Sequence, residues 1–411
     1  MHLHLSSAEV DFLADVRAFI DRHWPPAARR PRALSGGSES PGSPADTAWF
    51  AALAARGWSV PDWPREHGGT GWSVAQRYLW ARETALAEAP RLDPCGVDLV
   101  GPLLCALGSD WHRQVVLPTI REARARCCFA AAEPEAGSDL CRIATRAVPT
   151  ATGYRLDGVK CWVAGAARAR WMLCLARTSD EPEDPEQGLS LFLVDMTLPG
   201  LRLTPTAMLD GAADVATVTL EGVSLPEAAL IGGAGRGLEE LARLDRGLGA
   251  GGMLSWRLRA QAERLKTLAR ETADGSGLLL DDADFGRKLA TVEIALAALE
   301  GLELRALGEA TAAQRARGAS SNAPNVSPRM APLLKILRAQ AGQRLGELFV
   351  EALGYYGLPF PDALLIDNEG SIGHDYALSE IMGMLRGRSW SIDGGTTESH
   401  KNRIARTVLG F

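Results

Sequence analysis

Hydrophobic residues recur with two different periods along this chain of 411 residues, and the period changes twice. Spacings of three and four residues, typical of helices, fill the first part and return from about residue 235. Between them lie short apolar segments, rich in β-branched residues and separated by turn residues, which predict strands. Helices, then strands, then helices favour an α+β fold of separate domains over a βαβ sheet.

The first predicted helix, residues 6–23, has a clear start signal. Ser6 or Ser7 can serve as its N-cap, and Glu9 stands where a capping box needs it. The other predicted helices are 47–56, 72–88, 97–107, 110–123, 237–272, 284–317, 331–353, 378–390 and 399–409. The predicted strands are 153–163, 170–177, 189–196 and 215–223. We therefore expect an N-terminal α-helical domain, a middle β-domain and a C-terminal α-helical domain, at residues 1–126, 127–230 and 231–411.

Composition excludes several classes of protein. A net charge of −6 does not favour nucleic acid or an anionic membrane as a partner, because either would need a basic face. Membrane insertion is not expected, because no apolar run reaches the roughly 18 residues that span a bilayer. The seven Cys form no CxxC pair and the seven His lack ligand spacing, so we expect a cytoplasmic protein with neither a disulfide framework nor a metal. The glycines of 232–237 do not spell GxGxxG or open a βαβ unit, and predict a connection before a helix.

Five segments, in order along the chain, resemble the acyl-CoA dehydrogenase family. They are GWSVPDWPREHGGTG (57–71), the helix pair 101–118, FAAAEPEAGSDL (129–140), GYRLDGVKCWVAGAARARWMLCLAR (153–177) and LRGRSWSIDGGTTESHKNRIARTVLG (385–410). The combination of AEPEAGSD and GGTTES at this separation is a specific signal, and the resemblance covers nearly the whole chain. It implies an acyl-CoA dehydrogenase-like fold: an N-terminal helical domain, a middle β-domain and a C-terminal four-helix bundle.

The resemblance also implies a reaction, the flavin-dependent α,β-dehydrogenation of an acyl thioester. FAD would lie between the middle and C-terminal domains and take a hydride from the β-carbon, while a carboxylate removes the α-proton. Hydrogen bonds to the thioester carbonyl are needed to make that proton acidic. Acyl-CoA and acyl-carrier protein both fit as substrates, because both present phosphopantetheine, and the electron-transfer partner is left open. The family's assembly implies a homotetramer or homodimer, with a hetero-oligomer as the alternative.

The catalytic base is not where many family members carry it. The matching position is Gly394, which cannot take a proton, although its backbone N–H suits the thioester carbonyl. Other members place a Glu followed by Arg on the first helix of the C-terminal domain, and Asp245-Arg246 stands there in this chain. A helix would put Asp245 on one face with Leu241 and Leu248, with no cation three or four residues away. Unpaired burial would raise the pKa of Asp245 and suit it as the base; the alternative is an ion pair with Arg246 or with an Arg of another helix.

Further positions of the resemblance are expected to contact FAD. They are Ala132, Ser138, Trp162, Ala164, Thr396 and Glu398. The family has Thr at the positions of Ala132 and Ala164, so only backbone N–H groups would bond the flavin ring there. Trp162 is expected to stack beside the flavin, or else to be a plain core aromatic. Glu398 is expected near the adenosine or diphosphate, or else to be a surface carboxylate at a helix start.

These departures keep three hypotheses open. The first is an acyl thioester dehydrogenase with Asp245 as base. The second is a catalytically degenerate subunit that supports an active paralogue, which the missing Thr hydroxyls and the missing Glu favour. The third is an oxygenating flavoenzyme, which no residue of the sequence specifically favours. Two arginines of the last segment, Arg386 and Arg388, are interpreted as partners of surface acids.

Overall fold

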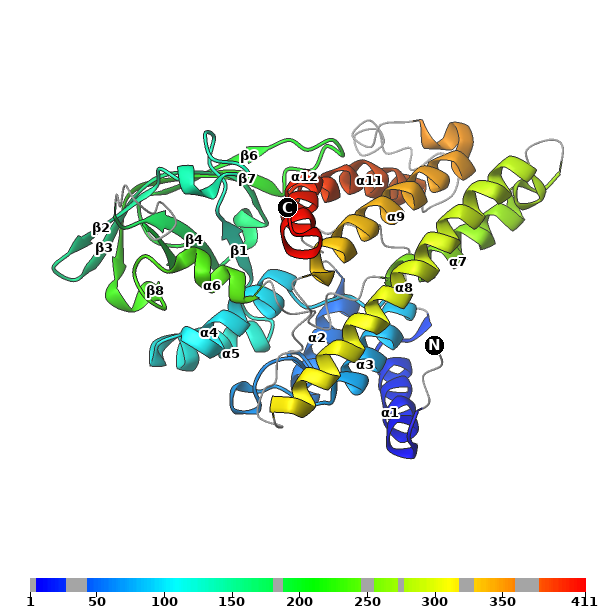
Figure 1. The fold of residues 1–411 in the computed structure, drawn as a ribbon, viewed down its shortest axis with the longest axis horizontal. Coiled ribbons are helices and arrows are strands. Elements are labelled where there is room, and N and C mark those ends of the chain that lie inside the picture. Colours follow the sequence, from blue (N-terminus) through cyan, green and yellow to red (C-terminus); the bar gives the residue numbers. More distant parts are fainter. Residues whose placement is uncertain are drawn as a thin grey trace.

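The computed structural model describes residues 5–26, 43–179, 188–244, 255–272, 277–317, 329–358 and 377–411. Asp245 and Arg246 lie outside these described residues. The strands gather on one side of the molecule, and the long helices α7 and α8 lie on the other (Figure 1). The predicted order of a helical, a β and a second helical domain is confirmed. The exact domain bounds, 1–126, 127–230 and 231–411, stay a prediction.

The N-terminal domain is built around tryptophans. Its helices are α1 (Ser7–His23), α2 (Pro44–Arg56), α3 (Val74–Leu86), α4 (Gly101–Leu107) and α5 (Leu117–Arg121). Ser6 and Glu9 form the predicted capping box at the start of α1. Trp49 and Trp63 are almost completely buried, and their indole N–H groups donate to the carbonyls of Pro90 and Val97 at 3.0 and 2.8 Å. These bonds let the rings contribute a large apolar area without leaving a buried donor unpaired.

Two of the predicted helices differ in detail from the expectation. Residues 97–107 and 110–123 each divide into a π-helical turn, Cys95–Val100 and His112–Val116, followed by a short α-helix. Pro102 and Pro118 stand in the first turn of those α-helices. A proline has no N–H to give to the preceding turn, so the hydrogen-bond register changes where each proline enters.

In the described part of the chain the middle domain is one eight-stranded sheet in the order β6-β7-β3-β2-β4-β5-β8, with β1 also paired to β4. The strands are β1 (Cys127–Ala130), β2 (Arg146–Thr150), β3 (Gly153–Ala164), β4 (Trp171–Arg177), β5 (Leu189–Asp195), β6 (Leu201–Thr206), β7 (Val215–Pro226) and β8 (Leu230–Ile231). Four of these match the predicted strands. The other four are short, and β6 is largely exposed, so they lack the apolar signal that identified the rest.

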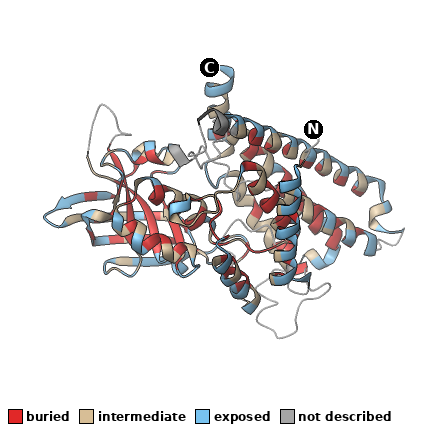
Figure 2. Cartoon of the chain, turned by 90° about the horizontal axis from the view of Figure 1, so that it is seen from below, coloured by how far each residue is buried: buried red, intermediate tan, exposed pale blue. Residues whose placement is uncertain are grey.

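Strands β4 and β5 join the sheet to the N-terminal domain. Leu173 and Leu191 belong to the tryptophan-rich core, whereas Met172 and Phe192, one position away, belong to the core of the sheet. Alternate residues of a strand face opposite sides, so both strands are covered on both faces. Figure 2 shows buried residues along the strands of the sheet. Coverage on both faces explains why the sequences of β4 and β5 read as continuous apolar runs.

The C-terminal domain is a bundle of long helices. Its described helices are α6 (Gly237–Leu244), α7 (Ser255–Glu271), α8 (Ala283–Arg317), α9 (Met330–Leu353), α11 (Ala377–Gly387) and α12 (Thr397–Ile404). Leucines and alanines of α7, α8 and α9 form its core, together with Ile381 of α11. The predicted four-helix bundle corresponds to α7, α8, α9 and α11. The short helix α6 instead packs Leu238 and Leu241 against the core shared by β5 and α4.

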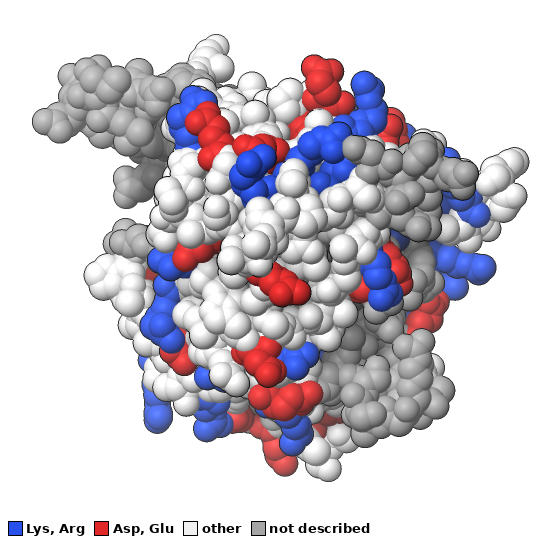
Figure 3. All heavy atoms as spheres, turned by 90° about the vertical axis from the view of Figure 1, so that its left-hand side faces the viewer, with Lys and Arg blue, Asp and Glu red and all other residues white. Residues whose placement is uncertain are grey.

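The face of the middle domain in Figure 3 mixes basic and acidic side chains, which lie next to one another across it. Arg170, directly before β4, and Asp195, at the end of β5, form an ion pair of 2.6 Å. Among the described residues, no helix combines the length and the apolar character needed to cross a bilayer.

Candidate flavin site and family

Trp162 sits on a bulge of β3. The register of β3 against β7 shifts between Lys160 and Val163, where an extra residue enters β3. Trp162 has a φ of 58°, in the left-handed region that a bulky side chain rarely adopts, and it is 62% exposed. Val163 is fully buried, whereas Ala164 is exposed on the same side as Trp162. The alternative of a core aromatic is therefore wrong, and the bulge presents the indole ring outside the sheet.

The signature loop lies directly beside this bulge. The Cys161 N–H donates to the carbonyl of Ala132 at 2.9 Å, so Ala132 is held next to Trp162. Ser138 lies farther along the same loop and is exposed. Neighbouring Gly137 has open space around the position of a Cβ. The structure thus brings Ala132, Trp162 and Ala164 together, with Ser138 on the adjoining loop.

A buried ion pair underlies the bulge, and the sequence analysis did not predict it. Lys160 is completely buried, and its Nζ lies 2.7 Å from Glu133 Oε1 and donates to the Ala131 carbonyl at 3.2 Å. Burial would raise the pKa of Glu133, but the Lys160 ammonium and hydrogen bonds such as that from the Ala144 N–H together lower it. One signal in the sequence could have indicated this pair. Lys160 stands among apolar residues of a predicted strand, inside a segment that resembles the family.

The other predicted contacts lie on the C-terminal domain. Gly394 and Gly395 have φ values of 66° and 102°, which glycine adopts without strain. Thr396 is the N-cap of α12, and its hydroxyl accepts from the Ser399 N–H at 3.1 Å. Glu398 is exposed in the first turn of α12. The positive end of this helix and its Gly-Gly loop suit an anionic group, although the Glu398 carboxylate already lies there. The places of Thr396 and Glu398 near the cofactor stay predictions.

Arg386 connects the C-terminal domain, which carries Gly394 and Thr396, to the middle domain, which carries Trp162. Its Nε donates at 2.6 Å to Asp210, which lies in the loop between β6 and β7 and is 1% exposed. The interpretation of its partner as a surface acid is therefore wrong, because the partner is buried. For Arg388 the interpretation holds, since Glu347, its partner at 2.7 Å, has a side chain that is 54% exposed.

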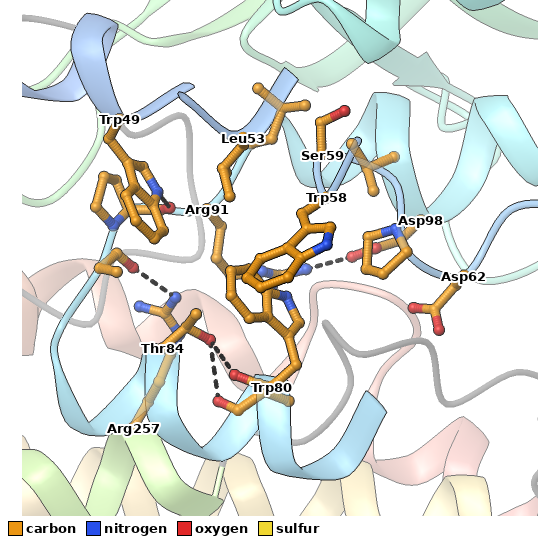
Figure 4. Close-up of a pocket in the computed structure, with 16 residues that line it drawn as sticks. Trp49, Leu53, Trp58, Ser59, Asp62, Trp80, Thr84, Arg91, Asp98 and Arg257 are labelled. Carbon is orange, nitrogen blue, oxygen red and sulfur yellow. Dashed lines mark hydrogen bonds and ion pairs between the residues drawn. The ribbon is translucent and has the colours of Figure 1, made fainter. Parts of the chain in front are cut away.

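The N-terminal domain contains a cavity of about 80 Å³ against α7. Trp49, Trp58 and Trp80 form its aromatic wall (Figure 4). Arg91 lines it and pairs with Asp98, and Arg257 donates to the Ala89 carbonyl at 3.0 Å. The cavity offers an apolar wall together with charged groups.

Comparisons with known proteins decide the family. Sequence profiles of the N-terminal, middle and C-terminal domains of acyl-CoA dehydrogenases match residues 6–123, 128–223 and 241–409. The chain belongs to the acyl-CoA dehydrogenase family. "Acyl-CoA dehydrogenase IpdE1" of Mycobacterium tuberculosis is 31% identical over 368 residues, which cover 89% of this chain and 87% of that protein.

Solved structures share the fold over the whole chain. The "Tcur3481-Tcur3483 steroid ACAD" superposes with a TM-score of 0.80 at 23% identity, covering 100% of this chain and 99% of that one. The "ChsE4-ChsE5 complex from Mycobacterium tuberculosis" gives a TM-score of 0.75 at 21% identity, with the same coverage. The "FAD complex of PigA" gives 0.72 at 18% identity, covering both chains completely.

The cofactor of this acyl-CoA dehydrogenase-type oxidoreductase is FAD. The described residues fit that cofactor. Trp162 offers an exposed aromatic face on a strained bulge, and such a conformation is retained where the surroundings enforce it. Ala132 and Ala164 leave the area beside the indole free of bulky side chains.

Proposed function

We propose that this protein dehydrogenates an acyl-CoA between the α and β carbons of its acyl group, with Asp245 as the base. The observation that carries the proposal is Trp162, displayed on the middle domain beside Ala132 and Ala164, in a chain that matches the family over all three domains. FAD, when bound, accepts the hydride from the β-carbon.

The residues of the chain have distinct proposed roles. Asp245 takes the α-proton, and the Gly394 N–H donates to the thioester carbonyl, where charge develops. Arg246, next to the base, orients it or pairs with it. Trp162 stacks on the flavin, with the backbone of Ala132 and Ala164 beside the ring and Ser138 close to it. Thr396 and Glu398 lie near the diphosphate or adenosine.

We further propose that the acyl group is bulky and steroid-derived. One comparison supports this substrate class. The steroid enzyme named above shares the fold along the whole chain.

Anaerobic flavin bleaching tests the reaction. The purified protein is expected to carry a flavin absorbance spectrum, and a steroid-derived acyl-CoA should bleach it faster than straight-chain acyl-CoA or acyl-carrier-protein thioesters. Asp245→Asn should retain FAD and lose bleaching, because a carboxamide cannot accept the proton. Asp281→Asn, at an exposed position of the C-terminal domain, is the matched control and should bleach normally. Full bleaching by the Asp245→Asn variant would remove Asp245 from the mechanism.

A second candidate is a subunit that works only with a related chain. Ala132, Ala164 and Gly394 stand where hydroxyl donors and a base are usual, and the ChsE4-ChsE5 structure is a complex of two different chains. Exposed apolar residues on the last segment, Ile392, Leu409 and Phe411, suit an interface with another subunit. Co-expression with related chains, followed by measurement of the flavin content per chain, separates the candidates. Flavin that appears only in a mixed oligomer favours the second.

A further inference from the structure

Glu133 and Lys160 form a buried ion pair beneath the bulge of β3 that carries Trp162. Glu133 is 6% exposed and Lys160 is 0% exposed. Besides Lys160, the Glu133 carboxylate accepts from the N–H groups of Ala144 and Thr145 at 2.7 and 3.0 Å. Lys160 also donates to the Ala131 carbonyl. The two side chains therefore tie together the start of the signature loop, its end and strand β3.

The pair lies close in sequence to Ala132 and Trp162, the residues proposed to contact the flavin. Glu133 directly follows Ala132, and Lys160 stands two positions before Trp162. Between these positions the Cys161 N–H bonds the Ala132 carbonyl, which closes a small ring of contacts around the bulge. These contacts lie on either side of Trp162, whose backbone is strained.

Stability alone does not account for such a pair. Removing two charges from water costs several kcal/mol, and well-packed apolar side chains of similar volume often give an equally stable or more stable protein. The left-handed backbone of Trp162 adds a further cost and persists only where its surroundings enforce it. A charged pair with directional hydrogen bonds enforces one geometry, which an apolar pair would not do.

We propose that Glu133 and Lys160 are positioning residues that hold the Trp162 bulge and the Ala132 backbone in the arrangement that binds FAD. This inference rests on the flavin site described under the proposed function. The two side chains act through Trp162 and Ala132 rather than by touching the cofactor.

An uncharged replacement of the pair separates positioning from stability. The double variant Glu133→Gln/Lys160→Met removes both charges, keeps an acceptor for the Ala144 and Thr145 N–H groups, and should unfold at nearly the same temperature as the native protein. Its FAD dissociation constant, measured by titrating the apoprotein and following flavin fluorescence, should rise about tenfold or more. The control is Glu303→Leu/Arg338→Met, which replaces a buried pair between α8 and α9 and should leave FAD affinity unchanged. If this double variant does not fold, Glu133→Gln alone removes the charge pair while keeping an acceptor for the loop amides.

Hydrogen exchange of the apoprotein gives a readout that needs no cofactor. Peptides covering residues 158–165 should exchange faster in the Glu133/Lys160 variant, whereas the Glu303/Arg338 control should match the native protein there. Unchanged exchange together with unchanged FAD affinity would overturn the proposal. Failure of the native protein to bind flavin would instead overturn the proposed function, and the exchange result would still decide whether the pair holds the bulge.

Discussion

Arg386 and Asp210 lock the C-terminal domain onto the middle domain. Arg386 Nε donates at 2.6 Å to an Asp210 carboxylate that is almost completely buried. Asp214, in the same loop, lies 3.8 Å from the same guanidinium, and its carbonyl accepts from the Gly165 N–H at 2.7 Å. Gly165 directly follows β3, so the contact joins α11 to the strand that carries Trp162.

Arg386→Ala is expected to destabilise the protein strongly. It would leave the Asp210 carboxylate buried without its guanidinium, a change that costs about 3–5 kcal/mol in comparable pairs. Chemical denaturation measures the free energy of unfolding. Arg388→Ala is the control two residues away, because its pair with Glu347 is partly exposed and should contribute less than about 1 kcal/mol. Equal losses in both variants would show that the Asp210 contact is no more than a surface pair.

Trp162→Gly is expected to separate folding from flavin binding. Glycine adopts a φ of 58° without strain, and the exposed ring buries little area. The free energy of unfolding of the apoprotein should therefore be unchanged or higher by up to about 1 kcal/mol. FAD affinity should fall by about tenfold or more because the stacking surface is lost, whereas Trp162→Phe should retain much of it. A destabilised apoprotein would show instead that the indole belongs to the core.

The helices and the central strands could be predicted because their signals are local. Apolar periodicity located α8 and α9 within a residue or two of their observed bounds, and the Ser6 and Glu9 capping box lies where it was expected. Strands β4 and β5 were found because burial on both faces makes their sequences continuously apolar.

The contacts between distant residues could not be predicted in this way. The Glu133 and Lys160 pair depends on the register of a bulge, and Arg386 meets Asp210 across 176 positions of sequence. In neither pair does the residue spacing within one helix or strand indicate which distant residue is the partner. The resemblance supplied the places of Trp162 and Gly394, but the exposure of Trp162 and its left-handed backbone required the structure.

His112 is expected to make stability depend on pH. It is completely buried, its Nδ1 accepts from the Ser109 N–H at 3.0 Å, and Nε2 has no partner among the described residues. Burial, helped by the neighbouring Arg113 charge, lowers its pKa from 6.5 to about 4. Because the folded pKa is depressed, its contribution is fully present above pH 6.5 and is lost as the pH falls toward 4.

The predicted loss from His112 is up to about 3 kcal/mol across that window. Denaturation curves at several pH values, for the native protein and for His112→Gln, isolate it from other titrating groups. The difference in unfolding free energy between the two proteins should be constant from pH 7 to pH 8 and should shrink below pH 6.5. Parallel curves down to pH 4 would assign the acid sensitivity elsewhere.

Two glycines in long helices are expected to respond in opposite directions to alanine. A Cβ on Gly342 of α9 would lie 2.0 Å from Trp390 Cζ3, whereas Gly301 of α8 is exposed with open space around it. Gly342→Ala should displace the indole at a cost of about 1–3 kcal/mol, and lower FAD affinity because Trp390 stands four residues before Gly394. Gly301→Ala should stabilise by about 0.5–1 kcal/mol through helix propensity alone. Chemical denaturation and FAD titration of both variants test this prediction. If the Gly342→Ala protein matches the native protein in stability and in FAD affinity, Trp390 does not position the Gly394 loop.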